Sequence, residues 1–205
     1  MAWIDWRVKS FAGDKDAPKE WDEITEKLKI ILPKKYIEKI ELTAFVIRDC
    51  RKARWILNKT DKEYCSKDDA LDTAKKLTSL MLLSEGNKPI SEDLKKLLLC
   101  KTKECTLFVG HEGSCGQGVN EVTNCPLCKQ IISLNDFDRD ARKDPMSVQL
   151  GHFIPLSRQN NGHNAKNVVW IHRKCNEIQS EQTMDELIKS LMNIVKSHGY
   201  EIMIK

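Results

Sequence analysis

Apolar residues recur three and four positions apart between residues 21 and 100, which is the spacing of helices that each bury one face. The recurrence falls into three runs. These runs are Ile24, Leu28, Ile31 and Leu32; Ile37, Ile40, Ala44 and Ile47; and Leu71, Ala74, Leu77, Leu80 and Met81. This half of the chain is therefore predicted to form a small helical domain.

Helix-breaking residues lie between these apolar runs, which supports their division into separate helices. Pro33 separates the first two runs, and the polar stretch 58–61 separates the second from the third. Gly86 and Pro89 precede a last short helix, for which Ser91 is the expected cap. From 101 to 124 the periodicity disappears and glycines accumulate. A loop-rich connector at 101–124 is therefore expected to follow a helical domain at 1–100.

The remainder of the chain, 125–205, has a different pattern. Segments 148–154 and 168–171 are candidate short strands. Thr183 and Glu186 have the spacing of a capping box, which predicts the start of a final helix. The expected fold class is α+β, with a helical N-terminal domain followed by a small mixed domain.

Composition narrows the class of protein without deciding the function. The chain has 205 residues, and 34 Lys and Arg against 30 Asp and Glu give a net charge of +4, which permits a polyanionic partner without demanding one. No apolar run reaches the length of about 18 residues that a membrane span needs. The start, Met-Ala-Trp-Ile-Asp-Trp, lacks the pattern of a secretion signal, so a cytoplasmic location is expected.

The eight cysteines change this picture, because in a reducing compartment clustered Cys and His more often hold metal than form disulfides. Two pairs stand out: Cys125-Pro-Leu-Cys128 and His172-Arg-Lys-Cys175. Each pair can grip one ion from a tight turn, and together they supply the four ligands of a closed, structural zinc site. The alternative is two unrelated pairs in turns.

The segment closed by this site reads Gly151-His152-Phe-Ile-Pro-Leu-Ser-Arg-Gln-Asn-Asn-Gly-His-Asn-Ala-Lys-Asn167-Val-Val-Trp-Ile-His172-Arg-Lys-Cys175-Asn176. Over about 123–182 it resembles the HNH endonuclease family. The resemblance implies the family's ββα-metal fold, a two-stranded hairpin followed by a helix, here stapled by zinc. It also implies hydrolysis of phosphodiester bonds in double-stranded DNA, with 5′-phosphate and 3′-hydroxyl products.

The resemblance also assigns roles to matching residues. His152 corresponds to the general base, Asn167 to the residue that orients its imidazole, and Asn176 to a ligand of the catalytic metal, Mg²⁺ or Mn²⁺. His172 stands where zinc-containing relatives carry a Cys, so it is assigned to the structural zinc rather than to the catalytic metal.

One departure from the family pattern affects the catalytic metal. Most members place Asp or Glu immediately before the base histidine, and Gly151 occupies that position here. The candidates for the missing oxygen ligand are Asp136, Asp138, Asp140, Gln149 and Glu181. The departure keeps open a different class of function, a degenerate nuclease retained as a zinc-stabilised DNA-binding module.

Two further histidine and cysteine features have weaker patterns. His163 lies in an Asn-Gly turn and is interpreted as a solvent-exposed histidine, with a phosphate or metal contact as the alternative. A second zinc site could form in the glycine-rich connector, where the spacing is looser. Its ligands would be Cys100, Cys105, His111 and Cys115.

Basic residues give two candidate DNA contacts, since phosphate binding needs Lys and Arg that follow a backbone. One group lies near the hairpin and helix: Arg158, Lys166, Arg173 and Lys174. The other lies on an expected helix beside Trp55: Arg48, Arg51 and Lys52. A solvated helix surface explains the second group equally well.

An HNH nuclease with an added helical domain suits a restriction enzyme, in which residues 1–100 would recognise the site. It also suits a phage or mobile-element nuclease. Cutting both strands with one site per chain would favour a homodimer.

Overall fold

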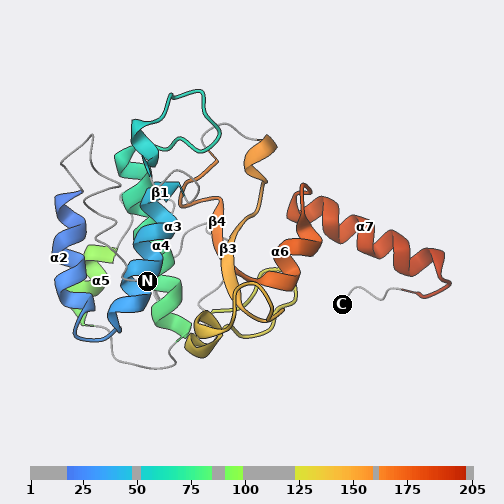
Figure 1. Cartoon of the computed structure of the whole chain (residues 1–205). Coiled ribbons are helices and arrows are strands. Elements are labelled where there is room, and N and C mark those ends of the chain that lie inside the picture. The colour runs from blue at the N-terminus through green and yellow to red at the C-terminus, as the bar shows by residue number, and fades with distance from the viewer. Residues whose placement is uncertain (1–17, 48–51, 85–90, 99–122, 159–161, 202–205) are drawn as a thin grey trace.

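The computed structural model describes residues 18–47, 52–84, 91–98, 123–158 and 162–201. Within them the first half forms the helices α2 (Lys19–Leu28), α3 (Lys34–Phe45), α4 (Lys67–Ser84) and α5 (Glu92–Leu98) (Figure 1). α3 packs against α4, and α5 packs against both α2 and α4. The backbone N–H of Leu94 donates to Ser91 Oγ at 3.3 Å, which confirms the expected cap. Helices are therefore present at the predicted runs 24–28, 37–44 and 71–81 and after Ser91.

The chain between α3 and α4 is a small antiparallel ribbon and a turn, where a helix was predicted. α3 ends at Phe45, because Val46 adopts an extended backbone with φ −118° and ψ 140°. β1 (Val46–Ile47) pairs with β2 (Lys52–Ala53), and a 3₁₀ turn, η1 (Arg54–Ile56), follows. The prediction that Ile47, Lys52 and Trp55 share a helix is therefore wrong. The β-branched pair after Phe45 prefers the extended form.

The second half is built around one hairpin and the helix that follows it. β3 (Val148–His152) pairs antiparallel with β4 (Val168–His172), with Gly151 opposite Val169 and His152 opposite Val168. α6 (Arg173–Gln179) begins directly after β4, and Figure 1 shows the hairpin between α4 and α6. Two 3₁₀ turns flank the hairpin strands, η2 (Leu134–Asp138) and η3 (Leu156–Arg158). The α+β class is confirmed.

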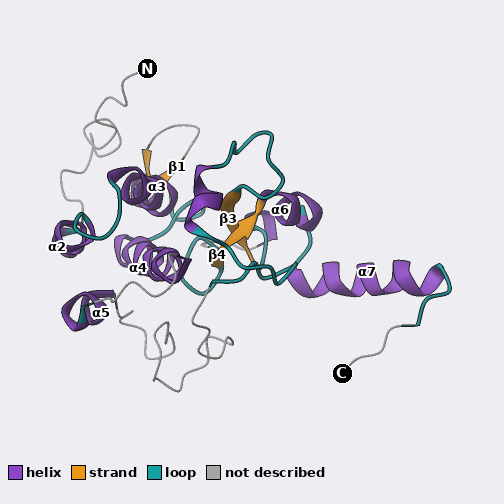
Figure 2. Ribbon diagram, turned by 90° about the horizontal axis from the view of Figure 1, so that it is seen from below, coloured by secondary structure: helices purple, strands orange, loops and turns teal. Residues whose placement is uncertain are grey.

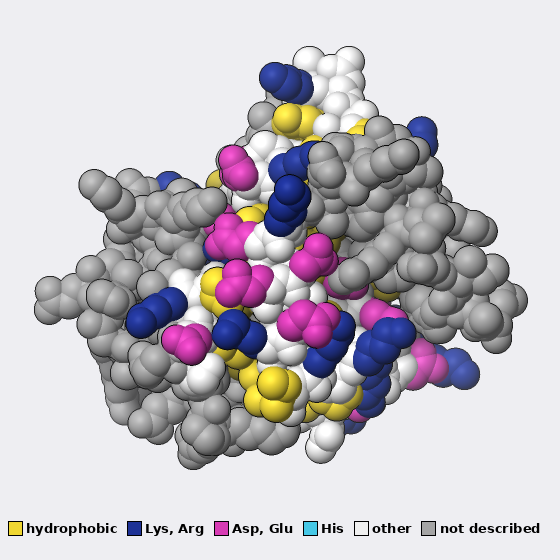
Figure 3. All heavy atoms as spheres, turned by 90° about the vertical axis from the view of Figure 1, so that its left-hand side faces the viewer, with side chains coloured by type: hydrophobic (Ala, Val, Ile, Leu, Met, Phe, Trp, Pro, Cys, Tyr) yellow, Lys and Arg dark blue, Asp and Glu magenta, His cyan; other side chains and the backbone are white. Residues whose placement is uncertain are grey.

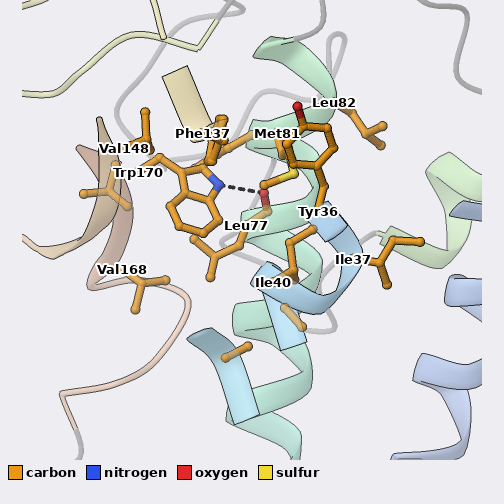
Figure 4. Close-up of a cluster of buried hydrophobic side chains, with 14 of the residues drawn as sticks. Tyr36, Ile37, Ile40, Leu77, Met81, Leu82, Phe137, Val148, Val168 and Trp170 are labelled. Atoms are coloured by element: carbon orange, nitrogen blue, oxygen red, sulfur yellow. Dashed lines mark hydrogen bonds between the residues drawn. The ribbon is translucent and has the colours of Figure 1, made fainter. Parts of the chain in front are cut away.

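Trp170 of β4 joins the two halves into one continuous core. All five residues of β4 are buried. The Trp170 indole N–H donates to the carbonyl of Leu77 in α4 at 2.9 Å, and its ring meets Phe137 edge-on with centroids 5.1 Å apart (Figure 4). The same cluster contains Ile40 and Met81. The boundary near residue 100 therefore divides the chain in sequence, while the buried side chains on either side of it pack together.

Polar side chains add further ties between the halves. Lys76 Nζ donates to the carbonyl of Ala165 at 2.6 Å, and Thr123 Oγ1 donates to the carbonyl of Leu80 at 2.5 Å. Both lysine and threonine are buried, so each bond satisfies a group that would otherwise be costly to bury.

The last helix, α7 (Met184–Ser197), extends away from the rest of the protein (Figures 1 and 2). Thr183 and Glu186 form the predicted capping box: Thr183 Oγ1 accepts from the Glu186 backbone N–H, and Glu186 accepts from that of Thr183. Met184 and Leu187 are buried at its base, whereas Leu191 and Ile194 are exposed. No helix among the described residues is long and apolar enough to span a membrane.

The face that carries α2 mixes Lys and Arg with Asp and Glu (Figure 3). Such a mixture gives no extended field of one sign, which a DNA backbone would need. In the part of the chain that the structure describes, this face is therefore a poor candidate for a nucleic-acid surface.

Candidate active site and metal cluster

Four predicted ligands meet where the first cysteine pair lies against the start of α6. Cys125 and Cys128 occupy a turn closed by hydrogen bonds from Cys125 N to the Gln130 carbonyl at 2.9 Å and from Lys129 N to the Cys125 carbonyl at 3.0 Å. Lys129 takes a positive φ of 59° to complete the turn. His172 ends β4 and Cys175 lies in the first turn of α6.

The geometry of this cluster fits a single tetrahedral ion. The three Sγ atoms and one ring nitrogen lie within 4.8 Å of one another, and Cys128 Sγ is 3.3 Å from His172 Nδ1. Ligand atoms bonded to zinc at about 2.3 Å for sulfur and about 2.0–2.1 Å for nitrogen lie at similar separations. The cluster can therefore bind a metal, as its spacing predicted.

His152 stands at the end of β3 and lines a hollow of about 220 Å³. Asn176 of α6, Ser157, Glu181 and Lys62 line the same hollow. The predicted base and the predicted metal ligand are therefore brought together. Sequence reasoning named Glu181 only as one of several oxygen donors, and it missed Lys62, which lies in a polar loop with no motif around it.

The electrostatic surroundings keep the His152 imidazole neutral. Burial, together with the smaller effect of the positive charge of Arg54, lowers its pKa to about 4. Arg54 is itself buried and paired with Glu63 through an N–O distance of 2.5 Å. A neutral imidazole at pH 7 has a lone pair with which it can accept a proton.

The depressed pKa predicts a pH-dependent stability. In the unfolded chain this imidazole binds a proton near pH 6.5, but in the native protein only near pH 4, so the unfolded state holds more protons between these values. The free energy of unfolding should therefore fall as pH falls through this window, by about 2 kcal/mol from His152 at about pH 5. Urea unfolding at about pH 7 and about pH 5 measures the change.

His152→Gln is the matched control for this measurement, because it lacks the titrating ring. The variant should lose less stability on acidification than the wild-type protein. Equal losses in the two proteins would contradict the depressed pKa.

Asn167 has different partners from those expected. Its Nδ2 donates to the carbonyls of Ile154 and Gly162, both at 2.8 Å, and its Oδ1 accepts from the Ile154 backbone N–H at 2.7 Å. Both amide hydrogens are therefore used by backbone carbonyls. The expectation that Asn167 hydrogen-bonds the imidazole is corrected: it holds together the two ends of the loop after β3, next to His152.

His163 is also placed differently from its interpretation as an exposed turn residue. Its side chain is fully buried, and its ring lies beside that of His152. The turn folds back onto α3, so a residue whose neighbours in sequence are polar becomes part of the interior.

The structure narrows the candidates for the second ligand of a catalytic metal. Asp136 caps η2 and pairs with Arg139, and Asp138 pairs with Lys35. Asp140 accepts from the backbone of Arg142. Gln149 Oε1 lies 3.3 Å from Asn176 Nδ2, and Glu181 lines the hollow. The last two remain candidates, and among the described residues that line the hollow Glu181 alone brings a carboxylate.

Gly151 is a glycine because β4 leaves no room for a side chain. A Cβ built there would lie 2.6 Å from Cγ2 of Ile171, and 3.6 Å from Asn176 Oδ1. Ile171 is fully buried and β-branched, so it cannot turn aside. The residue that breaks the family pattern therefore has a packing reason.

This contact predicts non-additive effects of substitution. Gly151→Ala should destabilise the protein by about 1–3 kcal/mol through overpacking, and Ile171→Ala by about 2–5 kcal/mol through the cavity it leaves. The double variant should be more stable than the sum predicts, by about 1 kcal/mol or more, because each change relieves the other. Chemical unfolding of the four proteins measures this, and strict additivity would exclude the proposed clash.

The predicted DNA contacts are scattered over the surface near the hairpin. Arg158 lies in η3, beside the hollow, and pairs with Glu186 at 2.5 Å. Arg173 pairs with Glu177 at 2.7 Å. Lys52, Lys166 and Lys174 are exposed. Several predicted residues lie outside the described part of the chain: Arg48, Arg51, Cys100, Cys105, His111 and Cys115.

Comparison with known proteins identifies a likeness of fold. No protein-family model and no curated protein sequence matches the chain. A solved structure, described as the crystal structure of a type II restriction endonuclease, superposes with a TM-score of 0.57 and 21% sequence identity. The alignment covers 80% of this chain and 76% of that one. The two proteins therefore share a fold over most of their length.

Proposed function

We propose that the chain is a metal-dependent DNA endonuclease of the HNH type, acting as a site-specific restriction enzyme. The observation that carries the proposal is the shared hollow: a neutral imidazole at the end of β3 and a carboxamide on α6 line one cavity. The hairpin and helix that present them are the elements that the family resemblance implies. The fold shared with a type II restriction endonuclease supports the same class.

In this proposal His152 is the general base that removes a proton from the attacking water. A general base must be unprotonated at the working pH and within hydrogen-bond reach of the water. The depressed pKa of His152 supplies the first condition, and its place in the wall of the hollow supplies access for water. Asn167 acts indirectly, by fixing the loop that follows His152.

Asn176 Oδ1 and the Glu181 carboxylate are the residues that would hold the catalytic cation. Amide and carboxylate oxygens are the ligands that Mg²⁺ and Mn²⁺ prefer, so the donor set fits. When bound, such an ion offsets negative charge on the phosphate and the departing 3′ oxygen. Glu181 would supply the carboxylate that Gly151 cannot carry.

Lys62 and Arg158 would position the DNA backbone at the hollow. Lys62 lines it directly, and Arg158 lies next to Ser157 at its edge. Lysine and arginine at such a place contact phosphate oxygens and so fix the register of the duplex without reading its sequence. Lys166, Arg173 and Lys174 extend these contacts in the proposal, and a two-fold dimer would bring a second site to the other strand.

In this proposal zinc occupies the cluster of Cys125, Cys128, His172 and Cys175 and has a structural role. The four ligands close the coordination shell, which leaves no position for substrate. The ion would tie the first cysteine turn to the start of α6, and α6 carries Asn176. Its contribution is therefore to hold a hollow-lining residue in place.

Two other uses of the chain compete with restriction. A phage or mobile-element nuclease would have the same chemistry with a different biological setting. A catalytically degenerate DNA-binding module is favoured by one observation, the absence of a carboxylate at Gly151. The two classes differ in a single property, hydrolysis of DNA.

The test is incubation of the purified protein with supercoiled plasmid and Mg²⁺ or Mn²⁺, using methylated and unmethylated DNA. Discrete fragments would support a site-specific enzyme, whereas a smear would indicate a nonspecific nuclease. A protein that binds DNA duplexes but leaves every plasmid intact with both metals would overturn the nuclease proposal in favour of the binding module.

A further inference from the structure

His163 is a buried histidine whose two ring nitrogens face two different partners. Its Nδ1 lies 3.4 Å from Nε2 of His152, and its Nε2 lies 3.2 Å from the carbonyl oxygen of Ala44. The side chain is fully buried, so its hydrogen bonds must come from within the protein. The three groups form one chain of contacts from α3 to the end of β3.

The chemistry of these partners determines where the protons lie. A carbonyl oxygen only accepts, so His163 Nε2 must carry the hydrogen. Burial lowers the pKa of His163 well below its usual value, so the ring is neutral and its Nδ1 has a lone pair and no hydrogen. Nδ1 can therefore only accept, and the hydrogen between the two rings must sit on Nε2 of His152.

The opposite arrangement is unfavourable on physical grounds. If His152 carried its proton on Nδ1, its Nε2 lone pair would face the lone pair of His163 Nδ1 at 3.4 Å in a buried site. To donate across this contact, His163 would have to carry its hydrogen on Nδ1. It would then lose the hydrogen bond from its Nε2 to the Ala44 carbonyl. Unpaired acceptors in a low-dielectric interior are costly.

The acceptor at the far end is supplied by the end of a helix. Ala44 lies in the last turn of α3, where carbonyl groups have no partner within the helix. Ala44 is fully buried, so His163 also satisfies a carbonyl that would otherwise be left without a hydrogen bond. His163 thereby connects the Ala44 carbonyl, in the helical half of the chain, to His152, which lines the hollow.

We propose that His163 is a positioning residue that fixes His152 in the Nε2–H tautomer and so leaves Nδ1 as the atom that accepts the proton from water. This inference rests on the proposed nuclease function. In the reaction an O–H bond of water breaks and its proton bonds to Nδ1. The water oxygen bonds to phosphorus, the bond from phosphorus to the 3′ oxygen breaks, and that oxygen takes a proton from a second water. The hydroxide left by the second water then takes the proton from Nδ1, which restores the neutral imidazole. Nε2–H stays bonded to His163 throughout, which holds the ring still.

A purely structural role for His163 would not fix which ring nitrogen of His152 carries the hydrogen. The test therefore measures the tautomer of His152 directly. The protein is labelled with ¹⁵N-histidine, and proton–nitrogen correlation spectra of the full chain show which ring nitrogen of each histidine carries hydrogen. Wild-type His152 and His163 should both show the Nε2–H form. An Nδ1–H form of His152 would overturn the inference, whether or not the protein cleaves DNA.

Two variants then separate positioning from packing. In His163→Gln the amide N–H can donate to Ala44, which leaves the amide oxygen facing His152, so the Nε2–H tautomer should persist. His163→Leu keeps a similar volume but removes the acceptor, so His152 should show mixed tautomers, and kcat for plasmid cleavage should fall about 10- to 100-fold with KM little changed. His198→Leu, at the exposed end of α7, is the control that should leave cleavage unchanged.

The outcomes distinguish this inference from the proposed function. Equal kcat for the wild type and the Leu variant, or an unchanged tautomer in the Leu variant, would overturn the positioning role. If the Leu variant does not fold, the Gln variant still tests the positioning role. Loss of the Nε2–H tautomer of His152 in the folded Gln variant would overturn it. A wild-type protein that shows the Nε2–H tautomer but cuts no DNA would count against the nuclease and leave the tautomer assignment standing.

Discussion

A His152→Ala variant is expected to cleave DNA about 10²- to 10⁴-fold more slowly than the wild-type protein, which is the usual contribution of a general base. Alanine removes the imidazole of His152 from the wall of the hollow while leaving the backbone of β3 intact. The proposed metal ligands and phosphate contacts remain, so binding of a duplex should change little. Single-turnover nicking of plasmid at saturating protein measures the chemical step directly.

The matched control for this variant is His198→Ala. His198 is exposed after the last turn of α7 and does not line the hollow, so its loss should leave the rate unchanged. Fluorescence anisotropy of a labelled duplex checks that both variants still bind. If His152→Ala nicks plasmid within about threefold of the wild-type rate, the base lies elsewhere.

Removal of the zinc proposed to occupy the cysteine and histidine cluster is expected to unfold most of the chain. Structural zinc contributes an apparent binding free energy of about 10–16 kcal/mol, which is as large as the whole stability of a typical domain, about 5–15 kcal/mol. The ion would join the cysteine turn to the end of β4 and the start of α6. Because Trp170 of β4 lies in the core shared with α4, unfolding should extend to the helical half. Circular dichroism before and after a zinc chelator measures it.

Cys175→Ser and Cys65→Ala give this experiment its controls. Cys175 belongs to the cluster, so its substitution should lower both the zinc content and the unfolding temperature. Cys65 is buried away from the cluster and its pKa is raised to about 12 by burial, so its substitution should leave the zinc content unchanged. Two zinc ions per chain would support the second site at 100–115. If the helical signal is unchanged after chelation, zinc does not stabilise the fold, and its proposed structural role is wrong.

Local patterns predicted those features that depend on neighbours in sequence. The spacing of Ile24 and Leu28, the caps at Ser91 and Thr183, and the two ligand pairs all correspond to what the structure contains. Each depends on interactions over a few residues, such as helix periodicity, a cap hydrogen bond or a turn that aims two ligands at one point. Such signals are readable in the sequence because the chain has little freedom to satisfy them otherwise.

Features that depend on distant contacts were missed or misread. Nothing near His163 in sequence indicates that its turn packs on Ala44, more than a hundred residues earlier. Arg54 follows the basic residues Arg51 and Lys52 in sequence, but its side chain is buried and paired with Glu63. The role expected of Asn167 came from a family pattern, whereas its amide is used by two local carbonyls.

The core that Trp170 shares with Leu77 has a consequence for protein engineering. A nuclease whose cutting unit folds by itself can be fused to a foreign DNA reader, but a fragment of this chain starting at 123 would expose Trp170 and the rest of β4 to water. Burial of side chains of that size is worth about 1.5–3 kcal/mol each, a large share of a small domain's stability. Under the proposed nuclease function, retargeting would therefore have to alter surface residues of the intact chain, because β4 shares its core with the helical half.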